Sequence, residues 1–125
     1  MTERGCVLVV DDEEGIRDTL REVVEMGGCS AVLAANGAEA LRLMARQRPC
    51  LVIIDLLMPV LSGAELIATM RSRPELADIP FIVSTSAPSR APRGIPVLAK
   101  PVDIPAVWEW MRRTCHCGQA SEDGS

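Results

Sequence analysis

The 125-residue chain lacks the features that usually mark nucleic-acid-binding and membrane-inserted proteins. Its lysines and arginines are scattered, and the formal net charge is -4 at pH 7, so there is no basic face for phosphate backbones or anionic lipids. The first apolar run, Cys6 to Val10, is too short for the core of a signal peptide and far too short to cross a bilayer. We therefore expect a cytoplasmic protein that neither binds nucleic acid nor inserts into a membrane.

Cysteine occurs in an odd number, five, and Cys6, Cys29 and Cys50 lie in or beside apolar runs, where a thiol behaves as a small hydrophobic side chain. A reducing compartment fits this pattern best. Residues 115–117 (Cys-His-Cys) carry soft metal ligands, but three adjacent residues cannot by themselves form a closed tetrahedral site. We therefore interpret 115–125 as a disordered polar tail and 1–114 as one domain.

Apolar runs alternate with amphipathic stretches along the domain. Runs that end in polar residues predict five short strands, at 6–10, 31–34, 51–55, 80–85 and 97–99. Apolar residues at helical spacing predict helices that begin near Ile16, after the N-cap Asn36, at about Ala64 after a capping box of Ser62 and Glu65, and after the N-cap Asp103. Strands that alternate with helices indicate an α/β fold with a doubly wound parallel sheet.

The segment between the fourth and fifth predicted strands departs from this alternation. It contains Pro88, Pro92 and Pro96 together with Gly94, and a helical stripe does not survive three prolines at that spacing. We expect a loop with at most one helical turn there.

Polar residues stand at the carboxyl ends of four of the predicted strands, and ligands of such sheets bind outside these ends. The residues concerned are Asp11, Asp12, Asp55, Thr85 and Lys100. Three carboxylates brought together repel one another and need a cation, and magnesium suits two or three acids with retained water. A carboxylate nucleophile surrounded by a metal, an ammonium group and a hydroxyl is what phosphoryl transfer to aspartate requires.

With these residues, positions 5 to 114 resemble the response-regulator receiver domain of two-component signalling, a CheY-like fold of flavodoxin-like strand order 2-1-3-4-5. The resemblance rests on Asp11-Asp12, on Asp55 in D-x-x-M-P-x-x-x-G (Met58, Pro59, Gly63), on Thr85 and on Lys100-Pro101. It implies that Asp55 accepts a phosphoryl group from a phosphohistidine of a histidine kinase or a histidine phosphotransfer protein. It makes the chain a phospho-acceptor signalling domain that acts on an effector protein, not an enzyme with an external substrate.

The resemblance also implies a role for each site residue. Asp12 and Asp55 would bind Mg²⁺ directly, together with the backbone carbonyl of Leu57, and Asp11 would act largely through water. Lys100 would contact the phosphoryl oxygens, and Thr85 would move to hydrogen-bond the phosphoryl group and so carry the signal. Because Leu57 and Ala87 offer no polar group to orient an attacking water, slow self-dephosphorylation is expected.

The chain departs from the family in two respects. The segment between Thr85 and Lys100 is shorter than usual, which shortens the family's fourth helix or replaces it by a loop. Val97 stands where the family usually has a Tyr or Phe whose rotation follows the Thr, and this chain has no tyrosine. A switch would then act through the Pro-rich loop. The one histidine, His116, lies in the tail, so the phosphohistidine must come from a partner.

Two rival interpretations remain open at this point. A phosphatase with an aspartyl nucleophile needs a second acid two residues after it, where this chain has Leu57. A pseudo-receiver, a binding module that never takes phosphate, usually lacks one of the acids, the lysine or the hydroxyl, and all are present here. We expect a stand-alone receiver with no output domain attached. The detached receiver of a hybrid kinase is the alternative, and the sequence does not separate the two.

Overall fold

Five parallel strands form the centre of the protein in this computed structural model, which describes residues 6–58, 61–91, 93–115 and 117. The strands are β1 (Cys6–Val10), β2 (Ser30–Ala34), β3 (Leu51–Asp55), β4 (Phe81–Thr85) and β5 (Val97–Ala99). Their order in the sheet is β2-β1-β3-β4-β5, which confirms the predicted order. The chain runs from β1 to β2 on one side and then crosses back to β3 on the other side of β1, so the carboxyl ends of β1 and β3 lie side by side.

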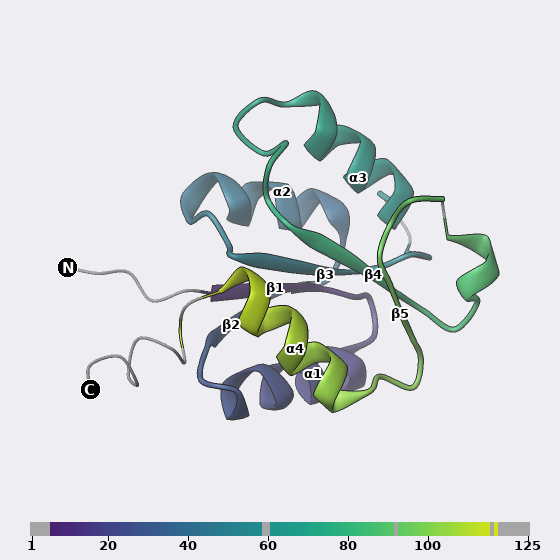
Figure 1. Cartoon of the computed structure of the whole chain (residues 1–125). Helices are drawn as coiled ribbons and strands as arrows, with labels where there is room; N and C mark the ends of the chain where they lie inside the picture. Colours follow the sequence, from purple (N-terminus) through teal and green to yellow (C-terminus); the bar gives the residue numbers. More distant parts are fainter. Residues whose placement is uncertain (1–5, 59–60, 92, 116, 118–125) are drawn as a thin grey trace.

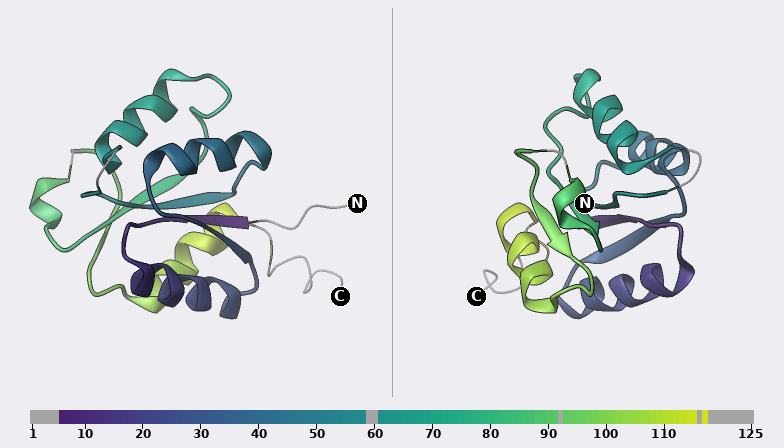
Figure 2. Two further views of the ribbon diagram at one scale, coloured as in Figure 1. Left: turned by 180° about the vertical axis from the view of Figure 1, so that it is seen from behind. Right: turned by 90° about the vertical axis from the view of Figure 1, so that its right-hand side faces the viewer.

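Helices cover both faces of this sheet (Figures 1 and 2). One face carries α1 (Glu14–Met26) and α4 (Ile104–Thr114), and the other carries α2 (Gly37–Arg46) and α3 (Gly63–Ser72). No helix among the described residues is long and apolar enough to cross a membrane.

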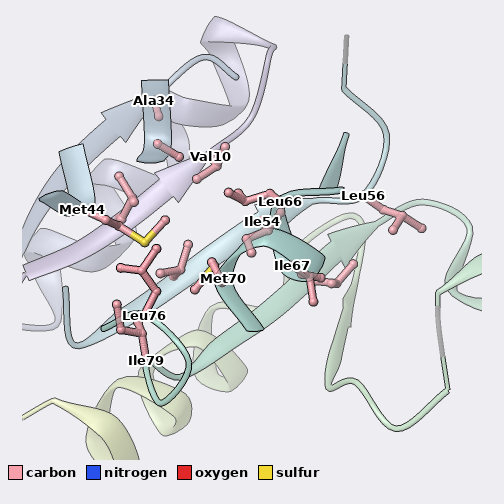
Figure 3. Packing of buried hydrophobic residues seen from close by; sticks show 14 of the residues in the cluster. Val10, Ala34, Met44, Ile54, Leu56, Leu66, Ile67, Met70, Leu76 and Ile79 are labelled. Carbon is pink, nitrogen blue, oxygen red and sulfur yellow. The ribbon is translucent and has the colours of Figure 1, made fainter. Parts of the chain in front are cut away.

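The apolar side chains of the strands alternate between two cores, one on each side of the sheet. Val7, Val9 and Ile53 pack under α1 and α4, whereas Val10 and Ile54 pack under α2 and α3. Figure 3 shows the second core, where residues of α3 such as Leu66 and Met70 meet the strands. Full burial of such a side chain stabilises the fold by roughly 1.5–3 kcal/mol. Both faces are therefore buried, which explains the unbroken apolar runs in the sequence.

The helix caps agree with the sequence at two helices and differ at a third. Asn36 accepts a hydrogen bond from the backbone N–H of Glu39, and Ser62 and Glu65 form the expected capping box. Asp103 occupies the N-cap position of α4, but its side chain makes no capping hydrogen bond, so the prediction of a side-chain cap was wrong. Pro105 in the first turn, which has no N–H to satisfy, reduces the need for one.

Between β4 and β5 the described residues form a single 3-10 turn, η1 (Pro88–Arg90). This confirms the prediction of a loop with at most one helical turn. Gly94 in this loop has a φ of 80°, a conformation that other residues rarely adopt. Pro92 lies outside the described residues.

Four of the five cysteines differ from the expectation of free thiols, because they form two disulfides, Cys29–Cys117 and Cys50–Cys115. Cys115 and Cys117 are thus attached to the domain, although the sequence places them in the tail. Residues 116 and 118–125 of that segment lie outside the described residues. Cys6 is the free cysteine of the described chain, and its burial raises the pKa of its thiol.

Gly63 explains the spacing of the D-x-x-M-P-x-x-x-G motif. A Cβ atom at this position would lie 2.5 Å from the backbone oxygen of Asp55 and 2.8 Å from Cα of Leu56. The Gly63 N–H also donates to the Leu56 carbonyl at 3.1 Å. The start of α3 therefore packs directly on the end of β3, and only glycine fits between them.

We expect Gly63→Ala to lower the free energy of unfolding by about 2 kcal/mol, because backbone must move to admit the methyl group. Urea denaturation followed by circular dichroism measures this loss. Gly15→Ala in α1 is the matched control, since nothing lies within 4 Å of the added Cβ. It should leave stability unchanged or raise it by up to about 1 kcal/mol. Equal stability of the two variants would contradict this view of Gly63.

Candidate functional site

Three carboxylates meet at the carboxyl ends of β1 and β3. Oxygen atoms of Asp11, Asp12 and Asp55 all lie within 4.8 Å of one another. Asp11 is 1% exposed and Asp55 is 7% exposed, whereas Asp12 is open to solvent. Two of the acids are thus removed from water while the third remains accessible, as in a shallow site that a solvated ion can reach.

Lys100 supplies the cation that opposes these acids. Its Nζ lies 3.2 Å from Oδ2 of Asp11 and 3.4 Å from Oδ1 of Asp55. Lys100 follows β5, and its backbone N–H donates to the carbonyl of Thr85 at 2.9 Å, which fixes the lysine against the end of β4. The peptide bond between Lys100 and Pro101 is cis.

The balance of charges shifts two pKa values in this site. The pKa of Asp55 is raised to about 6, because burial and then the negative charge of Asp11 raise it by more than Lys100 and a backbone hydrogen bond from Leu57 lower it. For Lys100, burial lowers the pKa, but the attraction of Asp11 and Asp55 outweighs it and the net shift is upward. One lysine does not fully neutralise the buried acids, so the site favours an additional cation.

Hydrogen bonds hold the Asp11 segment in place. The Asp11 side chain accepts from the N–H of Glu13 at 2.9 Å, and Arg17 donates to the Asp11 carbonyl at 2.8 Å. Arg17 is a supporting residue that sequence reasoning missed. The sequence shows only that Arg17 lies six residues after Asp11, near the start of α1. An arginine at that position can equally well point into solvent, so the sequence did not predict this contact.

Thr85 ends β4, one residue beyond the Asp55–Ser84 pair of the β3–β4 register. It is 2% exposed, and its hydroxyl oxygen accepts a hydrogen bond from the N–H of Ala87 at 3.0 Å. The Thr85 hydroxyl can therefore still donate its hydrogen to a ligand. The hydroxyl stands in a segment that leads directly into the η1 loop.

The donor set fits magnesium. Carboxylate oxygens are the hard ligands that Mg²⁺ prefers, and the exposed Asp12 leaves room for the waters that this ion retains. The backbone carbonyl of Leu57 is a further expected ligand. Leu57 lies two residues after Asp55, in the bend that follows β3. Its side chain is exposed and provides no polar group.

The five residues that the sequence singles out therefore stand along one edge of the sheet: Asp11, Asp12, Asp55, Thr85 and Lys100. Met58 of the motif packs against the core under α2 and α3, and Pro59 lies outside the described residues. A buried aspartate beside two further acids and a lysine, at the carboxyl ends of the strands of a doubly wound sheet, is the arrangement expected of a receiver domain.

The comparisons with known proteins agree with this class. The family of response regulator receiver domains matches residues 7–104, and the chain belongs to this family. Members of the family are signalling domains.

Among curated relatives, the chain is 40% identical over 87 residues to the response regulator MprA of Mycobacterium sp. (strain KMS) and 38% identical to that of Mycobacterium leprae. The match covers 70% of this chain and 37% of the relative's length. The chain thus corresponds to little more than a third of these regulators.

Among solved structures, a response regulator receiver protein from Pseudomonas putida is 34% identical with a TM-score of 0.76, and covers 90% of this chain and 99% of its own. The chemotaxis protein CheY4 of Vibrio cholerae, at 24% identity and a TM-score of 0.78 over 90% of this chain and 99% of its own, shares the fold.

The raised pKa of Asp55 predicts a pH-dependent stability in the absence of divalent metal. The folded carboxyl has a pKa of about 6, above its usual value of 3.8, so the folded protein binds the proton more tightly than the unfolded chain. The free energy of unfolding should therefore fall as the pH rises from about 4 to about 6.

Asp55→Asn removes this titration and should stabilise the metal-free protein by roughly 1–2 kcal/mol at pH 7, with little effect near pH 4. Urea denaturation in EDTA at several pH values measures the difference. Asp78→Asn, at an exposed carboxyl paired with Arg48, serves as the control and should not stabilise the protein at pH 7. A pH-independent effect of Asp55→Asn would refute this electrostatic account.

Proposed function

We propose that the chain is a phosphorylation-dependent switch in which Asp55 accepts a phosphoryl group from a phosphohistidine of a histidine kinase or a histidine phosphotransfer protein. The observation that carries the proposal is the grouping of three carboxylates within 4.8 Å of one another, with Lys100 Nζ at 3.2 and 3.4 Å from two of them. We further infer that the protein works in the cytoplasm, where ATP-dependent kinases form phosphohistidine.

Phosphoryl transfer at this site forms one bond and breaks one. A carboxylate oxygen of Asp55 attacks the phosphorus, and the P–N bond breaks with its electron pair going to the imidazole nitrogen of the donor, which takes up a proton. A carboxyl with a pKa of about 6 is mostly ionised at neutral pH and can act as this nucleophile. Asp12, Asp55 and the Leu57 carbonyl would hold a magnesium ion, with Asp11 acting through water, and the ion would supply positive charge for the phosphoryl oxygens.

Lys100 exchanges one of its two partners, Asp11 and Asp55, during transfer. Once Asp55 carries a phosphoryl group, its carboxylate charge is used in the new bond, and the lysine can bind a phosphoryl oxygen while it keeps Asp11. The ammonium group thereby stabilises both the product and the charge that develops during transfer.

Thr85 is the residue that would report the phosphorylated state. Its hydroxyl can donate to a phosphoryl oxygen, and a shift of Thr85 moves the segment that contains Ala87 and η1 because the Ala87 N–H is bonded to the same hydroxyl. This chain has Val97 where an aromatic residue is usual in the family, so we infer that the β4–β5 loop forms the surface that an effector protein reads.

The phosphorylation experiment combines the metal-free protein with Mg²⁺ and phosphoramidate or acetyl phosphate and follows the intact mass. We expect a gain of one phosphoryl group that EDTA prevents. Asp55→Asn should abolish the gain, and Asp78→Asn should not, because its carboxyl is exposed and paired with Arg48 elsewhere. A wild-type protein that gains no mass would instead be a pseudo-receiver, and turnover of a phosphomonoester would indicate a phosphatase.

The phosphorylated protein should be long-lived when alone. Attack by water needs a group to orient it, and neither the exposed apolar side chain of Leu57 nor Ala87 has one. We expect phospho-Asp55 to persist for many minutes after removal of the donor, as measured by the decay of the intact-mass signal. Decay within seconds would show that another group activates the water.

A further inference from the structure

A second cluster of metal-ligand side chains lies at the opposite edge of the sheet from the phosphorylation site. It consists of Cys29, Cys50, Cys115 and Cys117, whose sulfur atoms all lie within 4.8 Å of one another. Cys29 and Cys50 stand immediately before β2 and β3, at the amino ends of these strands, and Asp55 stands at the carboxyl end of β3. The cluster is therefore separate from the acidic site.

The fold itself brings these four residues together. Because α4 runs back across the sheet after β5, its last residues return to the amino edge, where Figure 1 shows the end of α4 beside the start of β1. Cys115 follows α4 directly, and Gly28, with a φ of 98°, turns the chain from α1 into Cys29. One ligand set is thus supplied by Cys29 and Cys117, which are 88 residues apart, and by Cys50 and Cys115, which are 65 residues apart.

We propose that, in the reduced protein, these four cysteines bind one Zn²⁺ as a structural tetrathiolate site, and that the two disulfides are the oxidised form of the same site. A Zn–S distance of about 2.3 Å in a tetrahedron places the sulfurs about 3.8 Å apart. The four sulfurs here all lie within 4.8 Å of one another, which leaves them close enough to bind one ion. All four positions would be filled by protein, which is typical of structural sites.

The choice of zinc follows from the softness and the spacing of the ligands. Thiolates select soft or borderline metals, and four sulfurs this close leave room for a single ion and not for an iron–sulfur cluster. The surroundings also suit a closed site, since Cys29 and Cys115 are buried and Cys50 and Cys117 are half-buried.

Backbone hydrogen bonds fix three of the four ligands independently of the disulfides. The N–H of Cys50 donates to the Cys6 carbonyl at 2.8 Å, that of Cys115 to the Met111 carbonyl at 2.7 Å, and that of Cys29 to the Val24 carbonyl at 3.3 Å. In addition, the Thr114 hydroxyl lies 3.6 Å from the Cys115 sulfur. The backbone at these three cysteines is therefore held without the disulfides, and a largely preformed site favours metal binding.

The two states exchange with balanced chemistry. A dithiol reductant gives each disulfide two electrons and two protons and becomes a disulfide itself, so the pair of disulfides yields four thiols. Binding of Zn²⁺ then releases the four thiol protons to solvent. In either state the end of α4 stays attached to the amino edge of the sheet. In a reducing compartment, zinc would maintain this attachment in place of the disulfides.

The test uses the full chain, reduced with a phosphine and dialysed with Zn²⁺ without oxygen, and measures bound metal by native mass spectrometry and elemental analysis. We expect one zinc per chain. The double variants Cys29→Ser/Cys117→Ser and Cys50→Ser/Cys115→Ser should bind none, and Cys6→Ser should bind as the wild type does, because Cys6 is a buried cysteine outside the cluster.

Because a serine variant can fail to fold, the wild type is also titrated with Co²⁺. An intense visible spectrum of a tetrahedral cobalt thiolate, displaced by Zn²⁺, supports the site, as does a melting temperature of the reduced protein that rises on zinc addition. The proposal is overturned if the reduced, folded wild type binds no zinc, if either double variant retains it, or if iron alone is found. Phosphorylation of Asp55 is scored separately, so a failure of one proposal leaves the other intact.

Discussion

The chemistry of the site depends on the repulsion between carboxylates at the ends of β1 and β3. Asp11 and Asp55 are buried side by side, and Lys100 reduces this repulsion without removing it, as the pKa of about 6 for Asp55 shows. Such an arrangement costs stability in the metal-free protein and persists because two packed cores and the backbone contacts around Gly63 hold the strand ends together. The same unbalanced charge makes the site receptive to a divalent cation and to the transfer chemistry that we propose.

The two edges of the sheet have different chemistry. The carboxyl edge gathers hard oxygen ligands and a lysine, whereas the amino edge gathers four soft sulfur ligands. A parallel sheet produces this separation because every strand begins at one edge and ends at the other. In this chain the helix α4 connects the two edges, since it starts shortly after Lys100 and ends at Thr114, directly before Cys115. A change at either edge can therefore act on the same helix.

Much of the fold was predictable because its signals are local. Unbroken apolar runs marked the strands, and the capping box at Ser62 and the N-cap at Asn36 marked helix starts. Three prolines were enough to predict the loop around η1. The acidic site was predictable for a related reason: parallel strands place their ends at one edge, so residues that follow strands must meet. Asp103 was less predictable, since an N-cap position does not ensure that the side chain forms the hydrogen bond.

The sequence by itself determined the alternation of strands and helices, the polar residues that follow the strands and the length of the loop after Thr85, because these follow from apolar patterning and residue type along the chain. The strand order was predicted only through the resemblance to receiver domains. Only the tertiary structure decided how the charges of Asp11, Asp55 and Lys100 balance, since burial and distances of about 3 Å set that balance. It also decided the partners of the cysteines. Cys115 and Cys117 look like part of a polar tail until the return of α4 brings them to Cys29 and Cys50, and no local pattern records a contact between residues so far apart in the chain.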